Sequence, residues 1–514
     1  MTVSRRKAQN PGGRGELTIG DTQNNVVRCS AIIPALLILG AQLPLSGVIP
    51  DTSFDTYQQR MAEGTTSSEE LTATALDEIE RQSHLNAFIS VDTVGALAQA
   101  RRLDEQRSQA QVLGPLYGIP IAVKDNIHVA DMPNTAGTPL LESFVPDEDA
   151  PVVARLKAAG AIVVGKTNLH ELAFGITSMN AAFGTVGNAC DPDFIAGGSS
   201  GGTAVAVAAG MAVAGLGTDT GGSSRIPAAL NGIVGFRPTV GRYPAEGLTP
   251  ISSTRDTVGP MARSVADVAV LDAVMADENT ELPEIDLRGL RLGVPRDYFY
   301  DDLEPLIVER IDALFSVLRD AGVILVEEDL VDIAALNQAA RLPIVPFEAP
   351  ILLREYLAEF VPGQTLEALV DSIASPDVRT MVASVVSGNV TESVYRQAID
   401  HDRPRLKEAY ASYFAENRVE AILFPTTPLT ARRIADIGDT IELNGEQVPT
   451  FGTYVRNTDP GSNAGIPGLS IPLPAAVDEM PAGFELDGPE GSDRRLLAIG
   501  AAIQSLVRQG EANL

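Results

Sequence analysis

Residues 196–227 read AGGSSGGTAVAVAAGMAVAGLGTDTGGSSRIP, and the rest of the chain can be understood from this stretch outward. It contains two Gly-Gly-Ser clusters, whose first serines are Ser199 and Ser223, on either side of an apolar run. Glycines before a serine allow the backbone a positive φ and a close approach to a ligand. We therefore expect two tight loops, each presenting a hydroxyl group.

Between the two loops, residues 201–210 are too uniformly apolar for a surface helix. This pattern predicts a buried helix that begins just after Ser200. The first turn of a helix has N–H groups without intrahelical partners and a partial positive charge, so it stabilises anions. Both a phosphate group and a developing oxyanion would fit such a place.

The phosphate interpretation has little support in the sequence. A P-loop requires a lysine directly after its last glycine, and neither cluster has one. A dinucleotide fingerprint requires a separate acidic residue about 20 positions after the first glycines. Asp219 lies at that distance, but it belongs to the second glycine loop itself.

The composition of the 514-residue chain is that of an ordinary globular protein, with 45% hydrophobic and 20% charged residues. A formal net charge of −29 argues against a nucleic-acid binder, because phosphate neutralisation needs clustered Lys and Arg. The cysteines and histidines lack the spacing of a disulfide framework or a metal site. They are Cys29, Cys190, His84, His128, His170 and His401. No metal and no cofactor is implied.

The first 50 residues differ from the rest, with five basic side chains against two acidic ones and then an apolar run. This is the outline of a secretory signal, and Arg5-Arg6 resembles a twin-arginine export motif. The arginine pair lies far upstream of the apolar run, no Ala-x-Ala site follows, and Pro34 and Pro44 disfavour a spanning helix. We expect residues 1–50 to form an N-terminal extension of a cytoplasmic protein, with export to the periplasm as the alternative.

Apolar strands alternate with helical patterns along most of the remaining chain, which predicts an α/β fold. We expect one large domain over residues 51–514, with a mixed but mostly parallel central sheet covered by helices on both faces. Residues 331–418 favour helices that prolines interrupt at 343, 346, 350 and 362. The expected strands are 85–91, 116–123, 161–165, 211–217, 233–236, 290–294, 323–327, 421–424 and 469–472. The expected helices are two within 53–82, then 93–109, 151–159, 201–210, 224–231 and 303–321.

A serine nucleophile needs a base, and the chain offers few. There is no G-x-S-x-G elbow and no histidine in a suggestive context, which argues against a Ser-His-Asp site. A lysine is a base when burial lowers its pKa. Lys124 follows the apolar run IPIAV and is the best candidate, while a salt bridge with Asp125 remains the alternative. With Ser199 and Ser223 it could form a proton relay.

Three segments together resemble the amidase signature family: GIPIAVKDN, GGSSGG and GTDTGGSSRIPA. Members of that family hydrolyse amide bonds through an acyl-enzyme with a Ser-cisSer-Lys triad. The resemblance covers residues 60–505 in outline. It implies Lys124 as the base, Ser199 as the bridging serine preceding the cis bond, and Ser223 as the nucleophile.

The resemblance also implies roles for the neighbours of Ser223. The backbone N–H groups of Thr220, Gly221 and Gly222, with that of Ser223, would form the oxyanion hole. Supporting roles fall to Ser200 at the oxyanion site, and to Asp219 and Arg225 as a pair that holds the loop. One departure is Ser224, where family members usually have an aliphatic residue, and this leaves two adjacent serines that a labelling reagent could confuse.

Three further segments resemble the bacterial indoleacetamide and mandelamide hydrolases of this family: KTNLHELAFGITS, RNTDPGSNAGIPGLSIP and GFELDGPEGSDRRLLAIG. This implies a small aryl or alkyl carboxamide as substrate, an arylacetamide for example. Residues 174–178 and 451–463 would be pocket walls, or else core. Carbamates, anilides and esters remain alternative substrates for the same triad, as does the role of an amidotransferase subunit with partner chains. A homodimer also remains open.

Overall fold

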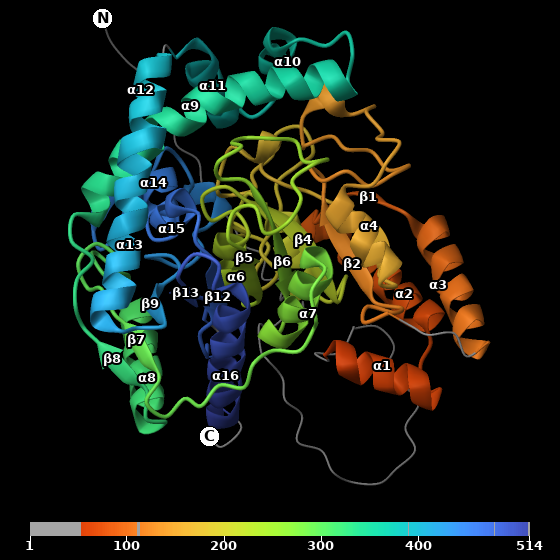
Figure 1. The fold of residues 1–514 in the computed structure, drawn as a ribbon. Coiled ribbons are helices and arrows are strands. Elements are labelled where there is room, and N and C mark those ends of the chain that lie inside the picture. The colour runs from red at the N-terminus through yellow and green to blue at the C-terminus, as the bar shows by residue number, and fades with distance from the viewer. Residues whose placement is uncertain (1–52, 110–113, 389, 477–478, 512–514) are drawn as a thin grey trace, which may run out of the picture.

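A mixed sheet of eleven strands organises the computed structural model, which describes residues 53–109, 114–388, 390–476 and 479–511. The strand order is β1-β3-β2-β4-β6-β5-β12-β13-β9-β7-β8, from one side of the molecule to the other (Figure 1). Helices flank the sheet, so the chain forms one large α/β domain. The strands are β1 Phe88–Val91, β2 Pro120–Lys124, β3 Ile162–Thr167, β4 Ala214–Asp219, β5 Val234–Arg237, β6 Thr257–Ala262, β7 Arg291–Gly293, β8 Ile324–Val326, β9 Ala421–Pro425, β12 Gly468–Pro472 and β13 Gly483–Asp487.

The predicted strands and helices are present within a few residues of their expected ends. The second of the two helices expected within residues 53–82 begins after Ser67, whose hydroxyl accepts the Glu70 N–H at 3.0 Å. The helices before residue 332 are α1 Phe54–Glu63, α2 Ser68–Arg81, α3 Thr93–Ser108, α4 Pro151–Ala158, α5 Gly201–Ala208, α6 Arg225–Asn231, α7 Val265–Ala276 and α8 Pro305–Asp320. The interpretation of residues 1–50 lies outside the described residues.

The expectation of a mostly parallel sheet is wrong. Of the ten neighbouring strand pairs in this sheet, four are parallel and six are antiparallel. The sequence analysis missed β6 and β13, which have antiparallel neighbours on both sides. Strand β6 escaped because Gly259 and Pro260 interrupt its apolar pattern. The sheet therefore has two groups of parallel strands, β3-β2-β4 and β9-β7-β8, and the strands between these groups pair antiparallel.

Prolines do not interrupt the helical region as expected. Helix α9, Ile333–Phe360, continues through Pro343, Pro346 and Pro350, and Pro362 follows its end. The three prolines are spaced three and four residues apart, so the missing N–H groups lie along one side of the helix. Packing against α11 and α13 stabilises α9 despite these losses. The other helices of this region are α10 Leu366–Ser372, α11 Pro376–Ser387, α12 Glu392–Gln397 and α13 Arg403–Asn417.

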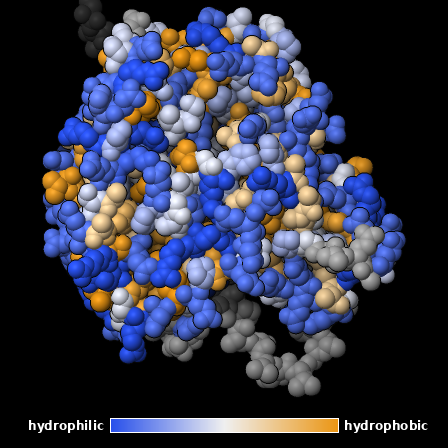
Figure 2. All heavy atoms as spheres, in the orientation of Figure 1, coloured by the Kyte–Doolittle hydropathy of each residue, from blue (hydrophilic) through white to orange (hydrophobic). Residues whose placement is uncertain are grey.

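Helices α9 to α12 form a cap at one end of the molecule, at the top of Figure 1. The remaining elements are α14 Thr450–Val455, α15 Asp459–Ala464, α16 Asp493–Glu511, and the hairpin of β10 Thr440–Leu443 and β11 Glu446–Pro449. Hydrophilic residues dominate the face shown in Figure 2, with apolar ones scattered among them. In the described ranges, no helix combines the length and apolar character needed to cross a bilayer.

Helix α5 is the buried helix predicted between the two glycine loops, and residues 201–207 have no appreciable exposure. It packs against β2, β4 and α6. A side chain at Gly202 would collide with the backbone carbonyl oxygens of Asn168 and Ala87. Glycine at this position therefore lets the helix start lie directly on neighbouring backbone.

We expect Gly202→Ala to lower the free energy of unfolding by about 1–3 kcal/mol, because the added methyl group overpacks this contact. The matched control is Gly438→Ala, where a Cβ would meet only Thr440 O at 3.7 Å. The control should stay within about 0.5 kcal/mol of the wild type. Urea denaturation measures both, and equal stabilities for the two variants would contradict the packing argument.

Candidate active site

Lys124 is the last residue of β2, and its side chain is completely buried. Its Nζ lies 2.7 Å from Ser199 Oγ and 2.7 Å from Thr218 Oγ1. Burial lowers the pKa of Lys124 to about 7, although Asp219 and Asp256 favour its charged form. A substantial fraction of this amine is therefore neutral near pH 7, in contact with a serine hydroxyl.

The alternative salt bridge between Lys124 and Asp125 is wrong. Asp125 pairs instead with Lys166 of β3, whose Nζ lies 3.0 Å from Asp125 Oδ1. Lys166 Nζ also donates to Asn134 Oδ1 at 3.1 Å. The sequence analysis overlooked Lys166 as a second buried lysine, although it too follows an apolar strand. Because Lys166 pairs with the adjacent carboxylate, the acceptors within hydrogen-bond distance of Lys124 among the described residues are two hydroxyl groups, those of Ser199 and Thr218.

The sequence analysis also missed Thr218 and Asn126. Asn126 Nδ2 lies 3.1 Å from Thr218 Oγ1, and that hydroxyl in turn contacts Lys124. The signal was available, since Asn126 follows Lys124 by two residues and Thr218 directly precedes Asp219. These two side chains fix the amine of Lys124 beside Ser199.

The first glycine loop places Ser199 against this lysine. A cis peptide bond joins Gly198 and Ser199. The cis bond was expected to follow Ser199, and this position is wrong, because the bond precedes that residue. The carbonyl oxygen of Ser199 accepts the backbone N–H of His170 at 3.1 Å. The Ser199 side chain is completely buried, so its hydroxyl contacts protein groups and not bulk water.

Ser200 connects the two glycine loops. Its backbone N–H donates to Ser223 O at 3.1 Å. Its hydroxyl lies 3.2 Å from Thr218 O and 3.3 Å from Thr218 N. Ser200 therefore joins the first glycine loop to β4 and to Ser223 of the second glycine loop.

Ser223 is half-buried, whereas its neighbour Ser224 is completely buried. The Ser224 hydroxyl points into the sheet, against Gly217 of β4 and Gly259 of β6. Of the two adjacent serines, only Ser223 is accessible from outside. A labelling reagent would therefore reach Ser223 and not Ser224.

Asp219 holds the second glycine loop from within, through two buried arginines. Arg225 Nε lies 3.1 Å from Asp219 Oδ2, and Arg237 Nη1 lies 3.0 Å from Asp219 Oδ1. Burial alone would raise the pKa of Asp219, but the two guanidinium groups outweigh it and hold that pKa below its usual range. The expected pairing of Asp219 with Arg225 is present in this structure.

The expected oxyanion donors do not all have free N–H groups. The Gly222 N–H donates to Asp219 Oδ1 at 2.8 Å. An N–H group that already donates to a carboxylate is not available to a substrate oxygen. The prediction that the Gly222 N–H belongs to the oxyanion hole is therefore wrong. The loop retains the N–H groups of Thr220, Gly221 and Ser223 as candidates.

The two expected wall segments differ in their position. Residues 455–459 pack against the second glycine loop, where Thr458 Oγ1 donates to Gly221 O at 2.6 Å. Phe174 instead belongs to a buried cluster with Leu353 and Tyr356 of the cap, so it is core. Ile176 is also buried. The segment around α14 and α15 is therefore the better candidate for a substrate wall.

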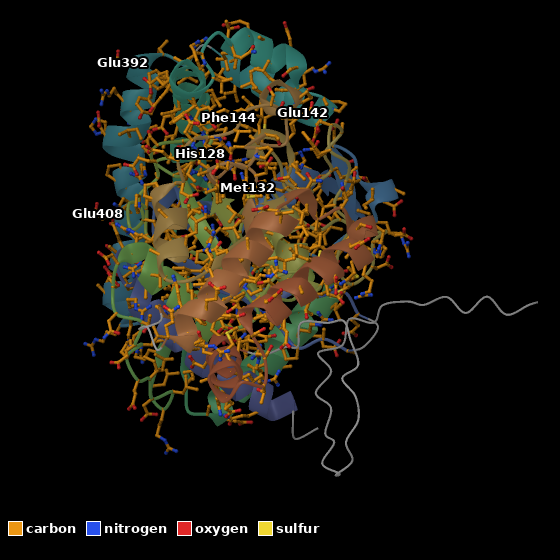
Figure 3. The ribbon with its side chains drawn as sticks, turned by 90° about the vertical axis from the view of Figure 1, so that its right-hand side faces the viewer. His128, Met132, Glu142, Phe144, Glu392 and Glu408 are labelled. Carbon is orange, nitrogen blue, oxygen red and sulfur yellow. The ribbon has the colours of Figure 1, made fainter. Side chains whose placement is uncertain are left out.

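A cleft of about 550 Å³ lies between residues 139–148 and the end of α9. Its lining includes His128 and Phe144, which Figure 3 labels. His128 Nε2 lies 2.9 Å from Tyr356 OH, and Asn134 Nδ2 lies 3.1 Å from the same oxygen. Asn134 accepts from Lys166, so polar contacts extend from the cleft to the Asp125–Lys166 pair. Lys124, Ser199 and Ser223 do not line this cleft.

A buried lysine with a lowered pKa contacts the Ser199 hydroxyl, and a backbone hydrogen bond joins the next residue to Ser223 of the second glycine loop. This arrangement fits a hydrolase of amide bonds. The chain belongs to the amidase family, whose model matches residues 70–497. Amide hydrolysis is accordingly its activity.

Relatives and solved structures agree with this assignment. The chain is 43% identical over 461 residues to the indoleacetamide hydrolase of Agrobacterium vitis, covering 90% of this chain and 98% of that protein. It is also 43% identical to the mandelamide hydrolase of Pseudomonas putida, covering 86% of this chain and 89% of that protein. A crystal structure of an amidase superposes with a TM-score of 0.78 at 34% identity, covering 89% of this chain and all of that one.

The position of Lys124 predicts how the activity depends on pH. Only the neutral amine accepts a proton, so kcat/KM should be constant at high pH and fall below about pH 7, by about tenfold per pH unit. Initial rates of ammonia release between pH 5 and pH 9 measure this profile. Lys157→Met is the control, because Lys157 lies at the surface and pairs with Asp149. A profile without an acidic limb in this range would exclude Lys124 as the base.

Proposed function

We propose that Lys124, Ser199 and Ser223 are the base, the bridging serine and the nucleophile of this amidase, and that its substrates are small arylacetamides. The contact of 2.7 Å between Lys124 Nζ and Ser199 Oγ carries the proposal, because it joins a buried base to a buried hydroxyl. The hydrogen bond from the Ser200 backbone N–H to the Ser223 carbonyl oxygen holds the second glycine loop beside the first.

The proposed reaction is an acyl transfer in two halves. Neutral Lys124 accepts the proton of Ser199, Ser199 accepts that of Ser223, and Ser223 Oγ attacks the carbonyl carbon of the amide. The relay then returns a proton to the nitrogen as the C–N bond breaks, and ammonia departs. Water attacks the resulting ester through the same relay and releases the carboxylate.

The oxyanion formed during attack needs donors that are already in place. In this proposal they are the N–H groups of Thr220, Gly221 and Ser223, which belong to the loop that ends at the nucleophile. Ser223 also begins the turn that leads into α6, where N–H groups favour negative charge. Asp219 and Arg225 support this loop from behind and do not take part in bond making.

The substrate proposal is supported by the relatives and by the wall segment. Two relatives have names that denote amides of aryl-substituted acetic acids. Phe451 and Val455 of α14 offer an aromatic ring and an aliphatic side chain, and Val455 lies near Gly221. An apolar wall beside the oxyanion loop suits an aryl group on the acyl side of the amide.

Ser223→Ala should abolish ammonia release from phenylacetamide, with a loss in kcat of about 10⁴-fold or more. Ser224→Ala is the matched control and should keep most of the activity, because the Ser224 hydroxyl faces the sheet. An assay of released ammonia with both purified variants measures the difference. Loss of activity in Ser224→Ala alone would contradict the assignment of the nucleophile.

A panel of substrates tests the proposed class. Phenylacetamide should have a higher kcat/KM than benzyl carbamate, phenylacetanilide or ethyl phenylacetate, with the purified chain alone and no partner chain. We also propose that residues 51–514 are the catalytic unit in the cytoplasm, so a chain lacking residues 1–50 should give the same ranking. A higher value for the carbamate, anilide or ester, or activity only with added partner chains, would overturn this proposal.

A further inference from the structure

Side chains outside the nucleophile loop hold three consecutive carbonyl groups of that loop. Arg237 Nη1 donates to Asp219 O at 2.6 Å, and Arg255 Nε donates to Thr220 O at 3.0 Å. Thr458 Oγ1 donates to Gly221 O at 2.6 Å. The orientation of each peptide plane between residues 219 and 222 is therefore fixed from outside the loop.

These contacts also determine where the N–H groups point. In a trans peptide, the carbonyl of one residue and the N–H of the next point in opposite directions. Within the described residues, the one cis bond joins Gly198 and Ser199, so the planes of this loop are trans. The Thr220 N–H therefore points away from Arg237, and the Gly221 N–H points away from Arg255.

Arg255 is itself firmly held. Its side chain is 3% exposed, and its Nη2 donates to Asp459 Oδ1 at the start of α15. Asp459 also accepts from Asn337 Nδ2 at 2.9 Å and lies 3.4 Å from Arg341 Nε. The guanidinium group thus bridges α15 and the backbone of the nucleophile loop.

The next residue in the chain anchors the same part of the loop. Asp256 Oδ1 accepts the Thr220 hydroxyl at 2.6 Å. Thr220 is therefore held at its carbonyl by Arg255 and at its side chain by Asp256, which restricts rotation of the peptide plane that carries the Gly221 N–H.

We propose that Arg255 is a positioning residue of the oxyanion hole: by holding the Thr220 carbonyl, it aims the Gly221 N–H at the oxygen that becomes negative during attack. This inference rests on the proposed role of Ser223 as the nucleophile. Arg255 does not touch the substrate. It acts on the transition state more than on the bound amide, because the donor it orients is needed most when the charge develops.

The test compares Arg255→Met with the wild type. Methionine keeps much of the apolar stem and leaves Asp459 with Asn337 and Arg341 as partners. We expect kcat for phenylacetamide to fall by about 10- to 100-fold, less than for complete loss of a donor, with KM changed less than about twofold. Affinity for phenylboronic acid, which forms a tetrahedral adduct on a serine, should fall by a similar factor, while inhibition by phenylacetate should not change.

Arg310→Met is the matched control, because Arg310 is also a buried arginine that pairs with a glutamate, Glu479, and donates to a backbone carbonyl. It should keep the kcat and the boronate affinity of the wild type. If Arg255→Met does not fold, as judged by circular dichroism, Thr220→Val replaces it. This variant removes only the hydroxyl that Asp256 holds, which loosens the same peptide plane, and it should show the same pattern with a smaller factor.

The outcomes separate the inference from the proposed function. Wild-type kcat and boronate affinity in Arg255→Met would overturn the inference, and so would equal losses of boronate and phenylacetate affinity, which indicate general distortion. If Ser223→Ala still hydrolyses phenylacetamide, the proposed function fails instead. Selective loss of kcat and boronate affinity supports the inference.

Discussion

The buried carboxylate of Asp219 is the interaction on which the active region depends. It lies at the end of β4, pairs with Arg225 of α6 and Arg237 of β5, and accepts the Gly222 N–H. Arg225 also contacts Glu485 of β13. Removal of one partner from such a buried group leaves an uncompensated charge, a loss of about 3–5 kcal/mol. The same carboxylate therefore joins distant strands of the sheet and holds the second glycine loop, which carries the proposed nucleophile, in its conformation.

Lys124 is in the opposite situation, because no carboxylate among the described residues lies within hydrogen-bond distance of its amine. Its nearest carboxylate in sequence, Asp125, is engaged by Lys166, so desolvation decides the protonation of Lys124. Two buried lysines on adjacent parallel strands thus have different roles. One neutralises an aspartate, and the other remains available for proton transfer.

The sequence predicted the buried helix α5, most strands and the meeting of Lys124 with Ser199, because each depends on a local pattern, while the catalytic roles of Lys124, Ser199 and Ser223 stay a prediction. Glycine clusters, apolar runs and a lysine at a strand end are all visible within a few residues. The direction of the strands in the centre of the sheet could not be read in this way, because it depends on how β6 and β13 return beside distant strands. Arg255 and Thr458 were missed for a similar reason: they reach the loop from 35 and 237 positions away in the chain. Asp125 is the clearest example of what local sequence patterns do not show. It pairs with Lys166 on the neighbouring strand and not with Lys124, which is adjacent in the chain.

The burial of Lys124 also has a consequence for the proton that ammonia needs when it departs in the proposed acylation step. An ordinary lysine ammonium, with a pKa of about 10.4, is a weak acid and gives up its proton slowly to a departing group. With its pKa lowered to about 7, the protonated Lys124 is a much stronger acid, and the Ser199 hydroxyl is a path for its proton. If Lys124 is the base, as we propose, the same dry environment that makes its amine available also makes its conjugate acid strong enough to protonate the departing ammonia, so one side chain would serve both directions of proton transfer.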